Sequence, residues 1–141
     1  GPLQAEYFRG WLAWLRHDQV RARYLWRHLI EDADKSTEGA GLAYKALAYC
    51  WLEQPADALR LLLENNSPAN DANSRRLLAI ALAMALEGDL EAVFSILNML
   101  KVRLSTQAGA LALLPDVNWL EFDQLLSDEV VKAKLRPYFD L

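Results

Sequence analysis

The sequence contains a single cysteine, Cys50, among its 141 residues. One thiol excludes a disulfide framework within the chain and any zinc site built from several cysteines. The two histidines, His17 and His28, do not have the i, i+4 spacing that lets two imidazole rings share one metal. The sequence also lacks a phosphate-binding glycine loop, a dinucleotide-binding fingerprint and a serine elbow. We therefore expect no metal and no cofactor, and we expect that the protein is not an enzyme.

An excess of positive charge and long apolar runs are also absent. The formal net charge is −4 and the pI is about 5.1, which disfavours nucleic-acid binding because phosphate contacts need a basic surface. The densest apolar stretch, Leu77–Leu86, is about half as long as a membrane span, so we expect no membrane insertion. With a free thiol and no secretory signal, we expect a cytoplasmic location, with the periplasm as the alternative.

The chain begins with Gly1-Pro2 in place of an initiator methionine. Such a pair is typical of the remnant left by a cleavage protease, so we interpret residues 1–2 as an expression scar. The remaining length suits one domain, which we place at residues 3–141.

Proline and glycine are sparse, at five and six residues, and they mark a few turns. Between the turns apolar residues recur every three or four positions, which is the helical period, and strand-like alternation is absent. This pattern predicts an all-α protein. We predict seven or eight helices, the first six at 3–15, 20–32, 41–52, 55–65, 70–86 and 90–103. Beyond residue 104 the pattern leaves open whether 105–114 is a further helix and whether 117–126 and 130–138 form one or two short final helices.

The predicted helical hairpins repeat. Ala58 and Ala92 each lie early in the second helix of a hairpin and are 34 residues apart, and Ala22 lies 36 residues before Ala58. A small residue lets two helices approach closely, and a bulky side chain can fill the groove beside it. Four positions after each alanine there is such a bulky residue: Trp26, Leu62 and Ile96.

In these features the chain resembles the tetratricopeptide repeat (TPR) family, whose period is 34 residues. Gly10 and Ala46 also match the small position of the family's first helix, and Tyr49 matches its aromatic position. The chain departs from the pattern at Ala13, where an aromatic residue belongs, and at Ile80, where a small one belongs.

This resemblance implies a right-handed α–α superhelix, or solenoid, with hairpins at about 3–33, 41–66 and 70–103 and a capping segment at 104–141. A helical bundle without repeats is the alternative. The tail is similar to segments that close bacterial arrays of this kind, which need a cap because the last hairpin exposes an apolar face. The side chains expected to cover that face are Trp119, Phe122, Leu125, Leu126, Leu135 and Phe139.

The resemblance also implies a concave groove, lined by the first helix of each hairpin, in which a peptide binds. The lining is apolar and aromatic, which suits the hydrophobic face of an amphipathic helix. It lacks the Lys/Asn arrangement with which some family members clamp a C-terminal carboxylate. The alternative is that these side chains are simply core. The candidate groove residues are Tyr7, Trp11, Trp14, Tyr44, Leu47, Trp51, Leu77 and Ala81.

Residues 9–27 carry five arginines and a single acidic residue, Asp18. Arg23 and Arg27 are at i, i+4 spacing and would share one helix face, which makes them a candidate dock for an acidic partner. The alternative is a solvated face whose long side chains cover apolar surface.

These features favour a non-catalytic protein–protein interaction module of adaptor, scaffold or chaperone-like type. Its groove would bind an apolar or amphipathic peptide from another protein or from its own chain. The alternative is a regulatory or ligand-sensing domain of a larger signalling or transcription protein, with a closed pocket for a small effector. Homo-oligomerisation stays open, because an empty apolar groove would be a large exposed patch.

Overall fold

The computed structural model describes residues 2–32, 40–64, 74–106 and 116–139. Within these ranges the chain forms eight α-helices, one short 3-10 helix and no strand, so the all-α prediction is confirmed. Most of the range 105–114, for which a further helix stayed open, lies outside the described residues. The elements are α1 (Pro2–Leu15), α2 (Gln19–Asp32), α3 (Ala40–Trp51), α4 (Pro55–Leu63), α5 (Ser74–Leu86), α6 (Leu90–Thr106), α7 (Asp116–Leu125), α8 (Glu129–Leu135) and η4 (Arg136–Tyr138).

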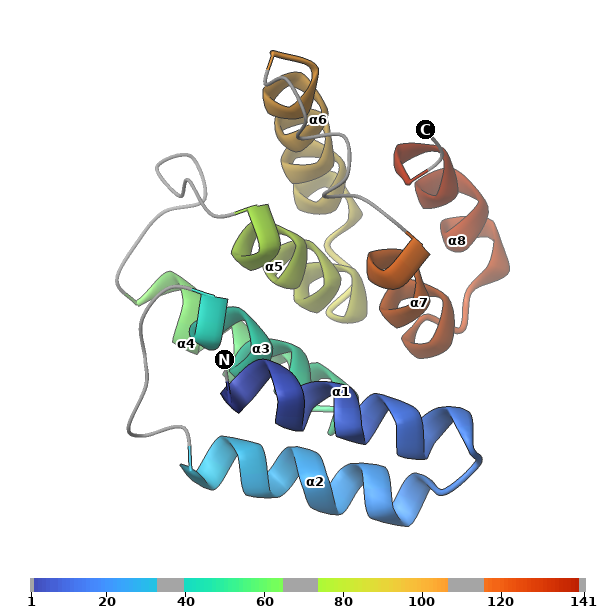
Figure 1. Ribbon diagram of the computed structural model, residues 1–141. Helices are drawn as coiled ribbons and strands as arrows, with labels where there is room; N and C mark the ends of the chain where they lie inside the picture. The colour runs from blue at the N-terminus through green and yellow to red at the C-terminus, as the bar shows by residue number, and fades with distance from the viewer. Residues whose placement is uncertain (1, 33–39, 65–73, 107–115, 140–141) are drawn as a thin grey trace.

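The helices pack as consecutive antiparallel pairs, α1 with α2, α3 with α4 and α5 with α6 (Figure 1). Each pair also contacts the next: α3 packs on α1 and α2, and α5 packs on α3 and α4. Helix α7 returns to contact α5, although it follows α6 in the sequence. In the described part of the chain, no helix is both long enough and apolar enough to cross a membrane.

The same turn joins the two helices of each pair. It contains one residue with a left-handed backbone, and these residues are His17 (φ 65°), Glu53 (φ 62°) and Gly88 (φ 87°). The next residue donates its backbone N–H to the carbonyl five positions earlier, in the pattern that commonly ends helices. These bonds are Asp18 to Ala13 (2.9 Å), Gln54 to Tyr49 (2.9 Å) and Asp89 to Met84 (3.0 Å).

These turns define the register of the second helices, and the third pair differs from the sequence-based prediction. In each pair, one backbone N–H of the second helix donates to the carbonyl of the residue that follows the left-handed one. The three bonds are Ala22 to Asp18, Ala58 to Gln54 and Val93 to Asp89. Val93 is fully buried, whereas Ala92 is half-buried. The predicted anchor Ala92 is therefore one residue out of register, because Gly88 follows Glu53 by 35 residues rather than 34.

The corrected register brings small residues together in the first helices. Gly10, Ala46 and Ala81 take equivalent positions and all three are buried, so the small residue of the third pair is Ala81 rather than Ile80. A Cβ atom at Gly10 would overlap the indole of Trp26, which explains why only glycine fits there. The bulky side chains four positions after the anchors are Trp26, Leu62 and Leu97.

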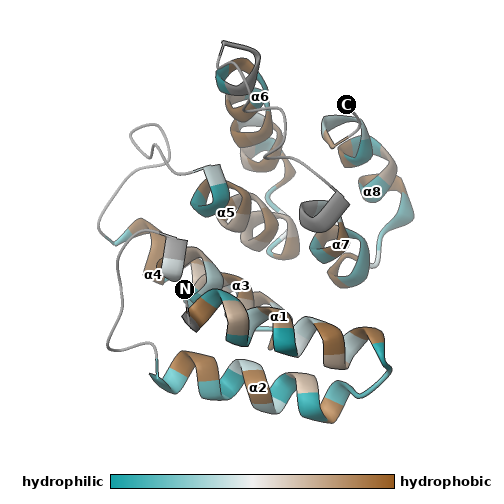
Figure 2. Ribbon diagram, in the orientation of Figure 1, coloured by the Kyte–Doolittle hydropathy of each residue, from teal (hydrophilic) through white to brown (hydrophobic). Residues whose placement is uncertain are grey.

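Helices α3 and α5 form the centre of the core. Every residue from Leu42 to Ala48 and from Leu77 to Ala83 is buried, which is the pattern of helices surrounded by protein. Figure 2 shows α5 as largely hydrophobic beyond its first turn, whereas α2 alternates between hydrophobic and hydrophilic residues. The first helices of the pairs therefore carry the apolar surface on which the tail can pack.

Candidate functional site

Helix α7 lies against the first helices of the three pairs (Figure 1). The hydroxyl of Tyr7 on α1 donates to Oε1 of Glu121 at 2.8 Å, and Nε1 of Trp14 donates to Oε1 of Gln124 at 3.1 Å. One small void is lined by Glu121 and Phe122 from α7 together with side chains of α3 and α5: Leu47, Arg75, Leu78 and Leu82. We call the surface of α1, α3 and α5 beneath α7 the inner face.

A buried chain of polar groups joins α3, α1 and α7. Nε1 of Trp51 donates to the hydroxyl oxygen of Tyr7 at 2.9 Å, and the Tyr7 hydroxyl donates in turn to Glu121. All three residues are buried. Among the described residues, no donor reaches Oε2 of Glu121. The hydrogen bonds from Trp51 to Tyr7 and from Tyr7 to Glu121 thus help to position α7 within an otherwise apolar contact.

The surroundings of this chain change its titration. Burial raises the pKa of the Glu121 carboxyl to about 7, although the hydrogen bond from Tyr7 and the charge of Arg75 act in the opposite direction. Burial also raises the pKa of Tyr7 well above its usual value, and the nearby Glu121 raises it further. Near neutral pH, Glu121 is therefore partly protonated while Tyr7 keeps its proton.

The predicted groove residues, all on α1, α3 and α5, come together in or against one hydrophobic core cluster. Six of them, Tyr7, Tyr44, Leu47, Trp51, Leu77 and Ala81, are buried, and Trp11 and Trp14 are half-buried. The aromatic rings pack on one another: the rings of Trp26 and Trp51 stack at 4.7 Å, and those of Trp14 and Trp51 are 4.9 Å apart. In this arrangement the side chains contribute to the core, and their role in binding a partner stays a prediction.

The tail packs at two places. The first is within the tail: the rings of Trp119 and Phe122 on α7 lie 5.3 Å and 5.1 Å from the ring of Phe139, which follows η4. Tyr138 reaches α6, where its hydroxyl donates to Oδ1 of Asn98 at 2.8 Å. We expected the tail to cover the last hairpin alone, and the contact of α7 with α1 was not predicted. Glu121 offered no clear signal for this contact, because Asp123 and Gln124 make it one of several polar residues in the same segment.

A cavity of about 360 Å³ opens beside α7. Its lining includes Trp14, Trp51, Arg23, Cys50 and Gln124. Burial raises the pKa of the Cys50 thiol, so the thiol stays protonated and is a poor nucleophile.

Only one of the two arginines of the predicted acidic dock lines this cavity. Arg23 is half-buried and lines the cavity beside the indoles, whereas Arg27 is exposed. The two side chains are on one helix, but they have different surroundings.

One group of side chains in the described residues has the proximity of metal ligands. Single ligand atoms of Glu6, His28 and Asp32 lie within 4.8 Å of one another. Nδ1 of His28 is 3.5 Å from Oδ2 of Asp32, a distance that also suits an i, i+4 ion pair. We did not predict this group, because Glu6 comes from α1 and the other two come from α2.

The comparisons with known proteins leave the family open. No family model, curated protein or solved structure matches this chain.

Proposed function

We propose that this protein is a protein–protein interaction module whose inner face binds an amphipathic helix of a partner in the place that α7 takes in the free protein. The TPR-like superhelix is part of this proposal. The equivalent turns of the three pairs support it, together with the buried small residues at positions 10, 46 and 81.

The observation that carries the proposal is the position of α7. Its Glu121 and Gln124 form hydrogen bonds with residues 114 and 110 positions away in the sequence, and its Phe122 is buried. The inner face therefore has the width and the polarity to accept one short helix. A partner helix needs the same pattern, which is a large apolar side chain beside one group that accepts from Tyr7.

The test uses a fluorescent peptide of residues 116–127 as the probe and the whole 141-residue chain as the receptor. Phe122→Ala in the protein weakens the hold of α7, so its inner face is vacated more often. The apparent affinity for an added helix rises with the fraction of open molecules. We expect the peptide to bind Phe122→Ala at least about tenfold more tightly than it binds the unaltered protein, measured by fluorescence anisotropy.

Two controls keep this test specific. Val130→Ala alters an exposed residue of α8 in the same tail, and it should leave peptide binding unchanged. A peptide carrying Glu121→Lys should not bind, because a lysine cannot accept the hydrogen bond from Tyr7. Gln124→Ala is a milder variant for the case that Phe122→Ala does not fold, and it should shift binding in the same direction. Two results would overturn the proposal. One is equal affinity of the 116–127 peptide and its Glu121→Lys form, and the other is no gain in affinity in a Phe122→Ala or Gln124→Ala protein that folds.

The cavity beside α7 favours a second candidate function, a sensor for a small effector. Its volume of about 360 Å³ falls within the usual range for small-molecule sites. An effector bound there would contact Trp14 and Gln124, whose hydrogen bond holds one end of α7. Trp14→Phe removes that donor and leaves most of the ring. An apolar ligand that raises the melting temperature of the unaltered protein but not that of Trp14→Phe would support the sensor.

A further inference from the structure

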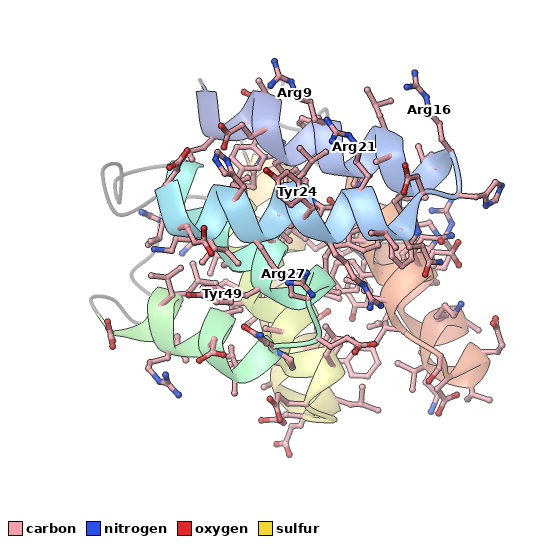
Figure 3. The ribbon with its side chains drawn as sticks, turned by 90° about the horizontal axis from the view of Figure 1, so that it is seen from below. Arg9, Arg16, Arg21, Tyr24, Arg27 and Tyr49 are labelled. Carbon is pink, nitrogen blue, oxygen red and sulfur yellow. The ribbon has the colours of Figure 1, made fainter. Side chains whose placement is uncertain are left out.

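The side of the first pair that carries Arg9 and Arg16 holds a second, separate surface. A cavity of about 500 Å³ lies between α1 and α2. Its lining includes three exposed arginines, Arg9, Arg16 and Arg21, together with one carboxylate, Asp18, and the apolar residues Leu12 and Leu25. Figure 3 shows Arg9 and Arg16 projecting from the edge of α1 and Arg21 between the two helices. Arg27 leaves α2 at its other edge in the same view.

These arginines have no acidic partner in the part of the chain that the structure describes. Arg9, Arg16 and Arg21 form no ion pair with any described carboxylate. The nearest acidic residue along the chain, Asp18, caps α2 by accepting the backbone N–H of Arg21 at 3.1 Å. Residues 9–27 thus have a formal charge of +4 in a chain of net charge −4.

The middle of this surface is apolar. Leu12 on α1 is 51% exposed, and Ala13 next to it also lines the cavity. Leu25 lies half-buried at the floor of the cavity. An exposed aliphatic centre between arginines favours a ligand that is itself partly apolar over a simple inorganic anion.

The spacing along α1 points to the shape of that ligand. Arg9, Leu12 and Arg16 are related by i, i+3 and i+7, so they share one face of the helix over about 10 Å. A second helix with the same spacing can place two carboxylates against the two guanidinium groups and an aliphatic side chain against Leu12. The planar guanidinium matches a carboxylate in a bidentate geometry.

The charge of the remaining chain restricts the class of partner. Outside residues 9–27 the net charge is −8, which opposes the approach of an extended polyanion such as nucleic acid or of an anionic membrane surface. A short acidic segment contacts the arginines alone and avoids this repulsion.

We propose that the α1–α2 surface formed by Arg9, Leu12, Arg16 and Arg21 binds an acidic amphipathic helix of a partner protein, with carboxylates two turns apart on either side of a leucine or isoleucine. This surface is distinct from the inner face, so the two can be occupied at the same time.

The test uses a synthetic helical peptide that carries two glutamates seven residues apart, with leucine between them. Binding to the whole 141-residue chain is followed by fluorescence anisotropy at low salt. Arg9→Gln combined with Arg16→Gln should weaken binding at least about tenfold. Leu12→Ala should weaken it about threefold or more, and a rise from about 50 to 300 mM NaCl should weaken it strongly in the unaltered protein.

The matched control combines Lys101→Gln with Lys134→Gln, which removes the same two charges from exposed positions elsewhere. It should change binding by less than about twofold. Binding that falls equally in both double variants, or that survives glutamine in place of the glutamates, would overturn the proposal. So would an absence of peptide binding at low salt, and so would capture of phosphatidylserine vesicles through Arg9 and Arg16 without capture of the peptide. The 116–127 peptide itself carries Asp116 and Asp123 seven residues apart with Leu120 between them, so the control peptide carries Asp116→Asn and Asp123→Asn. This control peptide should bind equally to both double variants, which separates this test from that of the proposed function.

Discussion

Helix α1 has two sides with opposite roles. On one side Tyr7 and Trp14 form hydrogen bonds with α7, and Tyr7 is completely buried. On the other side Arg9 and Arg16 are exposed and form no ion pair with a described residue. In the part of the chain that the structure describes, a later helix covers the aromatic side, and the arginine side stays exposed.

The difference follows from what each side gains on being covered. Removing aromatic side chains from water is favourable at about 25 cal/mol per Å², so the chain stabilises itself by covering them. Covering arginines without acidic partners is strongly unfavourable, because unpaired charges lose their hydration. The aromatic side therefore contributes to stability, and the arginine side remains available to an acidic partner.

The largest effect should come from Trp51→Ala, on the aromatic side of the comparison. Trp51 is 1% exposed, stacks on Trp26 and donates a hydrogen bond to Tyr7. Its removal leaves a cavity and takes away the donor to the buried Tyr7 oxygen, so the free energy of unfolding should fall by about 3–5 kcal/mol. Urea denaturation followed by circular dichroism measures the change.

Trp11→Ala is the matched control for this substitution. Trp11 is half-buried, and in the described residues its indole N–H has no partner. Its removal should cost less than half as much. Equal losses in the two variants would contradict the assignment of the inner face to the core.

A smaller and pH-dependent effect should come from Glu121→Gln. Burial raises the pKa of this carboxyl in the folded protein to about 7, from 4.5. Between pH 4.5 and 7 the folded protein binds a proton that the unfolded chain does not, so the stability of the unaltered protein falls as pH rises through this window. The titratable groups that interact with this carboxyl are Tyr7 from α1, Tyr44 and Cys50 from α3 and Arg75 from α5.

Glutamine resembles the protonated acid and carries no charge. At pH 8 the Glu121→Gln protein should therefore be more stable than the unaltered protein by about 3 kcal/mol, and at pH 5 the difference should fall below about 1 kcal/mol. Urea denaturation at the two pH values measures it. Asp123→Asn, on the same helix but beside Lys132, serves as the control and should show no such increase. A constant difference at both pH values would mean that Glu121 is not held in the apolar contact of α7.

Much of the fold could be predicted because helices have local signals. Apolar spacing gave the order of the helices, and turn residues placed their ends to within a few positions. The register of the third pair could not be predicted from the alanine spacing. It depends on the backbone of Gly88, and Val93 rather than Ala92 occupies the buried position.

The candidate site was only half predictable. The apolar residues of the first helices follow from periodicity, so Tyr7 and Trp51 could be identified in advance. What covers them could not, because the contact between Tyr7 and Glu121 joins residues 114 positions apart. The prediction that Arg23 and Arg27 form a dock also depended on local spacing alone. Helical spacing places them on one face, but the neighbouring α3–α4 pair and α7 decide that Arg23 lies beside a cavity.

The smallest effect on stability should come from Arg9→Gln combined with Arg16→Gln, on the other side of α1. Both side chains are exposed, and neither forms an ion pair with a described residue, so their loss removes no folded-state attraction seen there. The change also lowers the repulsion that each exerts on Arg21. The free energy of unfolding should stay within about 0.5 kcal/mol of the original value, and urea denaturation at low and high salt measures it. A loss above about 1 kcal/mol would show that the arginines stabilise the first pair. The two sides of α1 would then both contribute to the fold, and neither would be kept for a partner.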